Sequence, residues 1–220
     1  YNRLTEQIHL RTFCLRECEA YVKAAGLALN RNQILQYYMI FGGVPYYWGF
    51  LKKGLSLSQN IDSILFEKDA PLRDEFKYLY ASVFKKPENY VKIIEALGTK
   101  KVGMTREEII TATKIPNSGD LTTKLEELES CGFIRKYNAF GMKKKNAIYQ
   151  LMDCFTLFYF KFLKSEPTDE HFWTNQINTP AVNTWLGLAF ERVCMEHVDQ
   201  IKFKLGISGV LTEVNSWYCK

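Results

Sequence analysis

The chain has 220 residues, of which 47% are hydrophobic and 15% aromatic, and it carries 29 Lys and Arg against 24 Asp and Glu. This composition excludes a disordered or collagen-like protein, and a chain of this length can bury a core without disulfide or metal crosslinks. The formal net charge of +5 is lower than expected of a dedicated nucleic-acid-binding protein. We therefore expect one large globular domain or two smaller ones.

Cysteine usage and hydropathy predict a reduced, cytoplasmic protein. The six cysteines show no C-x-x-C motif. The most apolar run, residues 151–163, is shorter than the ~18 residues that cross a bilayer and contains Asp153 and Lys161. We therefore expect no membrane partner. The chain starts on Tyr1 and its first ten residues do not form a signal peptide, which suggests a fragment of a longer protein.

The first part of the chain, residues 1–66, opens with an alternating pattern typical of a short strand. Asn30 is a favourable N-cap for a helix that ends at Gly42 and Gly43, where glycine can adopt the left-handed conformation. Pro45 then begins a short aromatic helix, because proline is well tolerated in the first helical turn.

The second part, residues 67–165, is predicted to be helical and then briefly β-stranded. Its predicted elements are helices that begin near Pro71, Pro87 and Thr105, a helix over 120–131, and strands over 133–137 and 147–151. Thr105 and Glu108 form a capping box at the start of the third helix. Helices joined by a turn and followed by a two-stranded wing are the order typical of a winged helix.

The third part, residues 166–220, begins in a polar linker. One long helix then carries apolar residues at spacings of three and four from Val182 to Ile201, and residues 210–218 alternate like a strand. A terminal strand without a following partner is typical of a cut protein. Because an unpaired strand at either end could pair with another chain, a homo-oligomer is one alternative.

Nucleotide-binding loops are absent from this sequence. Neither GxxxxGK[ST] nor GxGxxG occurs, and these are the loops that hold nucleotide phosphates. No serine or cysteine forms a motif for nucleophilic catalysis with a histidine. We therefore predict no catalytic residue in this chain and no hydrolysis of ATP by the chain alone.

Several stretches nevertheless resemble one family. They are YNRLTEQIHL, ECEAYVKAAGL, YYMIFGGVPYYW, SQNIDSILF, GMTREEI, LEELESCGFI and WLGLAFERVCMEHVDQIKFKLGISGV. Over essentially the whole chain they resemble the C-terminal part of bacterial and archaeal AAA-type, STAND-like ATPases. In that family a P-loop core leads into a helical lid, a winged helix and a nuclease-like C-terminal domain of unassigned function.

The resemblance implies three units. They are the end of the ATPase core with the helical lid over 1–66, a winged helix over 67–165, and the start of a PD-(D/E)xK nuclease-like domain over 166–220. The implied fold class is mainly α with small β: a helical lid remnant, a winged-helix domain and a truncated α/β nuclease-like element. In the intact protein the winged helix would couple the nucleotide state to the C-terminal effector domain.

The resemblance also implies ligands and partners. The intact protein would bind ATP and Mg²⁺ as an ATPase, and the main partner of this chain would be its own ATPase core. The chain alone lacks a Walker A motif, so we expect no cofactor on it.

Three residues would face the nucleotide. By resemblance, Gly43, Val44 and Pro45 form a GxP element whose proline lies near the adenine, and a rigid ring without an N–H suits that contact. Arg3, in the YNR sequence, would sense the γ-phosphate. The alternatives are a helix end followed by a first-turn proline, and an ordinary surface arginine.

Charge divides the predicted winged helix into two halves. The helix over 120–129 holds four acidic residues and one lysine, a charge that repels phosphate. Residues 131–152 hold five basic residues and no acid: Arg135, Lys136, Lys143, Lys144 and Lys145. An alternative function is therefore a winged-helix nucleic-acid-binding module that contacts DNA through its wing. A charged wing is equally compatible with a solvated hairpin tip, or with docking of the winged helix on protein.

Glu191 is a candidate metal ligand. The Phe-Glu pair at Phe190 resembles the first element of a PD-(D/E)xK nuclease, in which carboxylates hold a divalent metal. Glu213 and Lys220 do not have E-x-K spacing, so the site is incomplete in this sequence. A degenerate or truncated nuclease is thus a third alternative, and an exposed helix carboxylate is the simplest interpretation of Glu191.

Two further features are expected to be structural. His197 falls on the apolar side of the last predicted helix, so we expect a histidine in the core or at its rim with satisfied hydrogen bonds. Phe155, Phe158 and Phe162 have helical spacing, which favours packing in the core over a stacking surface for bases.

Overall fold

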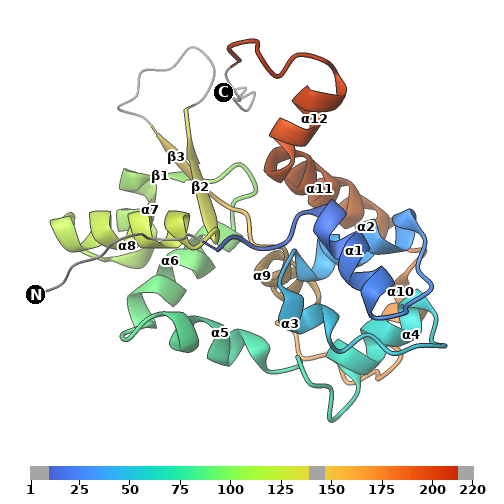
Figure 1. Ribbon diagram of the computed structural model, residues 1–220. Helices are drawn as coiled ribbons and strands as arrows, with labels where there is room; N and C mark the ends of the chain where they lie inside the picture. Colours follow the sequence, from blue (N-terminus) through green and yellow to red (C-terminus); the bar gives the residue numbers. More distant parts are fainter. Residues whose placement is uncertain (1–9, 139–146, 213–220) are drawn as a thin grey trace, which may run out of the picture.

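The computed structural model describes residues 10–138 and 147–212 (Figure 1). The protein is mainly helical with one small antiparallel sheet of three strands, which confirms the predicted fold class of mainly α with small β. The strand expected at the start of the chain lies almost entirely outside the described residues. Of the strand expected over 210–218, residues 210–212 are described and are not in a strand.

The described residues form α-helices, short strands and two short π-helices, η1 and η3. In chain order they are α1 (Leu15–Ala24), α2 (Arg31–Phe41), α3 (Pro45–Trp48), α4 (Leu57–Ile61), η1 (Asp62–Phe66), α5 (Glu75–Val83), α6 (Glu88–Gly98), β1 (Met104–Thr105), α7 (Arg106–Thr113), α8 (Gly119–Ser130), β2 (Ile134–Tyr137), β3 (Ile148–Leu151), α9 (Cys154–Phe158), η3 (Tyr159–Leu163), α10 (Phe172–Gln176), α11 (Pro180–Glu196) and α12 (Val198–Lys204). No helix in the described ranges is both long and apolar enough to cross a membrane.

Local capping fixes the starts of α2 and α7 where the sequence predicts them. The Asn30 side chain accepts a hydrogen bond from the Gln33 backbone N–H at 2.9 Å, and the Gln33 side chain bonds back to the Asn30 N–H. Thr105 and Glu108 form the same reciprocal pair at the start of α7. At the other end of α2, Gly42 has φ of +60°, a value that glycine adopts without steric cost.

Three helices and a two-stranded hairpin follow one another in the order predicted for a winged helix, and a further short strand, β1, was not predicted. Helix α6, strand β1, helices α7 and α8, and the hairpin of β2 and β3 follow one another, and the strands lie in the order β1-β3-β2. Ile134 pairs with Leu151, and Met104 pairs with Tyr149. Gly103, with φ of +87°, allows the chain to pass close to the Tyr149 carbonyl as it enters β1.

Most of the remaining helices pack together on the other side of the molecule, whereas α5 is drawn below α6 (Figure 1). Helix α2 contacts α1, α9 and α11, and α10 contacts α4 and η1. As predicted, Phe155, Phe158 and Phe162 are buried, and Phe158 contacts the rings of Trp173 and Trp185. One continuous cluster of buried apolar residues runs from α1 to α11 across all three predicted units, and the boundaries at 66 and 165 stay predictions.

Two predicted helices differ in their bounds. The helix expected to begin near Pro71 begins at Glu75, because residues 71–74 form turns in which the Leu72 N–H bonds to the Ile64 carbonyl. The helix expected to run through residue 201 breaks at His197, whose φ and ψ are −110° and 23°. Beyond this break Ile201 is 40% exposed, so the predicted apolar side does not continue into α12.

Candidate functional site

The turn between α2 and α3 is built around a glycine that a side chain would obstruct. Gly43 is buried, and its carbonyl accepts a hydrogen bond from the Phe13 N–H at 2.8 Å. A Cβ on Gly43 would overlap the backbone carbonyl of Phe13. On the inner side, Trp48 donates its indole N–H to the Gly42 carbonyl at 2.9 Å. The turn is therefore held between the segment that precedes α1 and the start of α3.

Helix α3 presents one anchored side and one exposed side. Tyr47 and Trp48 are buried in the core, whereas Pro45 is exposed and the Tyr46 side chain is 61% exposed. The half-buried ring of Phe50 lies 5.0 Å from the Tyr46 ring in an edge-on arrangement. A proline and a tyrosine on a rigid turn offer a flat apolar surface to an aromatic ring. The third predicted nucleotide contact, Arg3, lies outside the described residues.

The wing places its two described basic residues in different surroundings. Arg135 is half-buried, donates through Nε to the Gln150 side chain at 2.7 Å, and lies 4.4 Å above the Tyr137 ring. Burial and the neighbouring Arg192 lower the pKa of its guanidinium. Lys136 is exposed. The other predicted wing contacts, Lys143, Lys144 and Lys145, lie outside the described residues.

The acidic residues of α8 are bound largely within the protein. Asp120 pairs with Lys124 at 2.5 Å, and Glu127 accepts a hydrogen bond from the Tyr90 hydroxyl. Glu129 accepts the Lys136 backbone N–H at 3.1 Å. These contacts leave the excess of negative charge on the helix unchanged, so α8 remains unsuited to the phosphate-lined major groove.

A buried arginine in α11, which the sequence analysis did not identify, contacts the chain just before β1. Arg192 is only 6% exposed and donates through Nη2 to the Lys101 carbonyl at 2.8 Å. The Gln150 side chain donates to the same carbonyl at 2.6 Å. Arg192 lies seven residues after Trp185, which places it on the apolar side of α11. A basic residue among apolar ones on a helix indicates a buried polar contact, and this was the signal in the sequence.

Glu191, the predicted metal ligand, lies at the protein surface and forms an ion pair with Arg192. Its side chain is 53% exposed, and its carboxylate lies 3.9 Å from the Arg192 guanidinium. Within residues 10–138 and 147–212, no three His, Cys, Asp or Glu side chains lie close enough together to hold a metal ion. The arrangement around Glu191 is that of a surface carboxylate.

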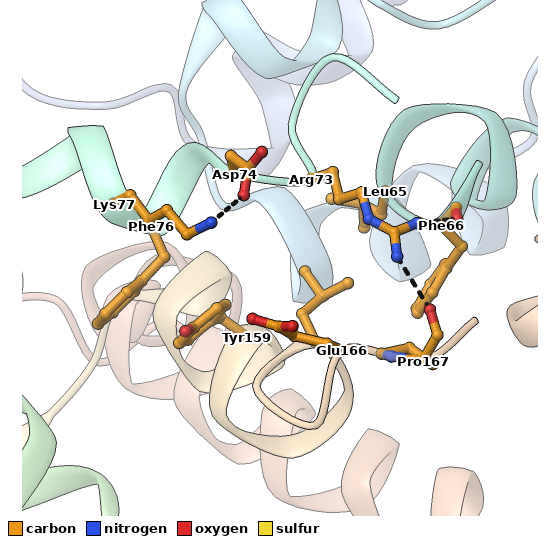
Figure 2. Close-up of a pocket in the computed structure, with 10 residues that line it drawn as sticks. Leu65, Phe66, Arg73, Asp74, Phe76, Lys77, Tyr159, Glu166 and Pro167 are labelled. Atoms are coloured by element: carbon orange, nitrogen blue, oxygen red, sulfur yellow. Dashed lines mark hydrogen bonds and ion pairs between the residues drawn. The ribbon is translucent and has the colours of Figure 1, made fainter. Parts of the chain in front are cut away.

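A small pocket of about 130 Å³ lies between η1, the start of α5 and η3 (Figure 2). Arg73 donates to the Phe66 carbonyl at 2.5 Å and to the Pro167 carbonyl at 3.0 Å. Lys77 pairs with Asp74 at 2.5 Å beside it. These polar groups bind one another across the pocket, so its clearest role is to hold the polar segment around Pro167 against η1.

Asp62 holds the start of α10 from inside the core. Its carboxylate is 2% exposed and accepts the Trp173 N–H at 2.7 Å and the Thr174 N–H at 3.1 Å. The Thr174 hydroxyl donates to it as well, at 2.5 Å. The predicted polar linker is thus held at Pro167 by Arg73. Helix α10, which follows it, is held at Trp173 and Thr174 by Asp62.

Comparison with protein-family models, with curated proteins and with solved structures gave no match to this chain.

Proposed function

We propose that this chain is the regulatory C-terminal portion of a P-loop, AAA-type, STAND-like ATPase. In this proposal the winged helix couples the nucleotide state of the ATPase core to a C-terminal effector region. The observation that carries it is the turn at Gly43, which leaves Pro45 and Tyr46 exposed on a rigid support. This is the position of the GxP element in the family that the sequence resembles.

The exposed side of α3 suits an adenine ring. Stacking of a base on an aromatic side chain is worth about 1–3 kcal/mol, and Tyr46 has an accessible ring for it beside Pro45. The phosphates and Mg²⁺ would be held by the ATPase core, since this chain contains no phosphate-binding loop. Arg3 would contact the γ-phosphate, where a guanidinium neutralises the charge that develops during transfer.

The contact of Arg192 supports a coupling role for the winged helix. Its guanidinium joins α11 to the carbonyl of Lys101, which lies just before β1. A buried charged donor that loses its acceptor destabilises a protein by several kcal/mol. Separation of α11 from the winged-helix region would break the Arg192 contact, so the two should move together. A change in position at the winged helix would then reach the C-terminal part of the chain.

The proposal predicts a loss of nucleotide affinity in one surface variant. In a protein that joins this chain to its P-loop core, Tyr46→Ala should weaken ATP binding about tenfold, because the stacking surface is removed. Tyr78→Ala is the matched control, since Tyr78 is 66% exposed on α5, and it should leave the affinity unchanged. Equilibrium binding of a fluorescent ATP analogue measures both.

Two results would contradict the nucleotide proposal. One is saturable ATP binding by this chain alone, because the phosphates should need a Walker A motif that it lacks. The other is an unchanged ATP affinity in the Tyr46 variant. In the gene, we expect codons for a Walker A motif upstream of Tyr1.

The observed order of helices and strands also favours a second candidate, a DNA-binding winged helix that uses its wing. That function predicts DNA affinity at low salt, with a logarithmic salt slope about 3 units smaller after Lys143, Lys144 and Lys145 are replaced by alanine. A fluorescence-anisotropy titration with a DNA duplex at several salt concentrations separates the two functions. The ATPase proposal expects no measurable affinity of the unmodified chain at low salt.

A further inference from the structure

One hydroxyl in α2 faces two hydrogen-bond acceptors from distant parts of the chain. The Tyr38 hydroxyl oxygen lies 3.0 Å from the Phe13 carbonyl oxygen and 3.2 Å from Oε2 of Glu196. A tyrosine hydroxyl carries a single hydrogen, so it can donate to only one of them at a time. Desolvation of its carboxyl group raises the pKa of Glu196 to about 7. Above that pH the Glu196 carboxylate is ionised, so it and the Phe13 carbonyl both accept only and compete for this hydrogen.

The same short segment makes two more hydrogen bonds. The Phe13 N–H donates to the Gly43 carbonyl at 2.8 Å, and the Leu15 N–H donates to Nε2 of His197 at 3.0 Å. Because Nε2 accepts, the histidine is neutral with its hydrogen on Nδ1, which lies 2.8 Å from the Val193 carbonyl. This confirms the expected histidine in the core or at its rim with satisfied hydrogen bonds.

His197 lies where the long C-terminal helix breaks. It ends α11 and precedes α12, and the Ile201 N–H in the first turn of α12 bonds to its carbonyl at 2.9 Å. Its ring is 7% exposed and meets the Tyr38 ring edge-on at 5.3 Å. Phe13, before α1, therefore contacts the Gly43 turn, and Leu15, the first residue of α1, contacts the α11–α12 break.

We propose that residues 13–15 are a mechanical link between the Gly42–Pro45 turn and the α11–α12 break, with the Tyr38 hydroxyl as its two-position switch. In the first position the hydroxyl donates to the Phe13 carbonyl and fixes the link to α2. In the second it donates to Glu196, which ties α2 to α11 and leaves the link held at its two ends only. Glu196 is exposed, so water can satisfy its carboxylate in the first position.

All contacts of the link lie within this chain, so it does not depend on nucleotide binding. If the proposed ATPase function holds, the link gives the route by which the turn beside the nucleotide acts on the C-terminal part. The hydrogen bond of Tyr38 has two discrete positions, and a change at either end of the link can shift the equilibrium between them.

The test is amide hydrogen exchange on the whole chain, followed by NMR, with two variants that should act in opposite directions. Tyr38→Phe removes the switch, and we expect exchange at the Leu15 amide to become about fivefold faster, the effect of one hydrogen bond. Glu196→Ala removes the competing acceptor, so the hydroxyl donates to Phe13 only. We then expect exchange at Leu15 to become at least twofold slower.

Tyr37→Phe is the matched control on the same helix. The Tyr37 hydroxyl is buried without a hydrogen bond of normal geometry, so its removal should leave exchange at Leu15 unchanged. Faster or unchanged exchange at Leu15 in Glu196→Ala would overturn the switch, because a purely structural Glu196 could only add protection.

A further variant tests the link from the other end. Pro45→Gly loosens the turn at an exposed residue, and we expect exchange to become about twofold faster at Phe13, Leu15 and Ile201 together. An unchanged rate at Ile201, with a changed rate at Phe13, would overturn the link. Neither measurement involves ATP, so a failed link and a failed nucleotide site give different results.

Discussion

Replacement of Gly43 by alanine is expected to destabilise the protein by about 3 kcal/mol, the upper part of the range for overpacking. The added Cβ would coincide with the backbone carbonyl of Phe13, and three Phe13 backbone atoms lie nearest to it. A side chain could rotate away, but a backbone carbonyl cannot. The segment before α1 must therefore leave the turn, and the Phe13 hydrogen bonds to Gly43 and Tyr38 are lost with it.

Urea denaturation followed by circular dichroism measures this loss. Gly119→Ala is the matched control, because no atom lies within 4 Å of the added Cβ at the exposed start of α8. We expect it to change stability by less than about 1 kcal/mol. A loss below about 1 kcal/mol in Gly43→Ala would show that the segment before α1 is not held in this turn.

Removal of the Asp62 carboxylate is expected to lower the free energy of unfolding by a similar amount, about 3 kcal/mol. Two backbone N–H groups of α10 and the Thr174 hydroxyl donate to it inside the core. Hydrogen bonds to a charged acceptor are worth about 1.5–3 kcal/mol each, and their energies are not additive. Asp62→Ala would leave the buried backbone N–H of Trp173 without this acceptor. Helix α10 should then separate from η1 before the rest of the core unfolds.

Asp169 provides the comparison for Asp62. It accepts the His171 N–H and the Asn175 side-chain amide, each at 2.9 Å, but it is exposed, so water can replace it in both bonds. Asp169→Ala should therefore cost less than about 1 kcal/mol in the same denaturation experiment. Equal losses in the two variants would show that burial does not set the strength of the Asp62 contact.

The candidate site could be predicted from the sequence only where its residues are neighbours in the chain. The turn at Gly43 and Pro45 forms a local motif, and the structure places the glycine where only a glycine fits. Tyr38, Glu196 and His197 gave no such signal, because Tyr38 and Glu196 are 158 residues apart and Leu15 and His197 are 182 apart. Their meeting depends on how α11 packs against α2.

The charge pattern of the predicted wing also shows what the sequence alone does not reveal. The sequence counts Arg135 and Lys136 alike as basic wing residues, yet Lys136 is exposed and Arg135 turns toward Gln150 and Tyr137. Gln150, which accepts the hydrogen bond from Arg135, lies on β3, and Arg192 of α11 lies close enough to lower the pKa of Arg135. A count of charges along the chain contains no information about which side of a strand meets another element.

The helix starts at Asn30 and Thr105 and the strand pair β2–β3 follow from the sequence by itself. Caps and apolar spacing act between residues a few positions apart, and their energies do not depend on the rest of the fold. The break at His197, the main core that joins all three predicted units and the contacts of Phe13 were decided only by the tertiary structure. These features depend on hydrogen bonds and packing between segments far apart in the chain, which form only once the helices have assembled.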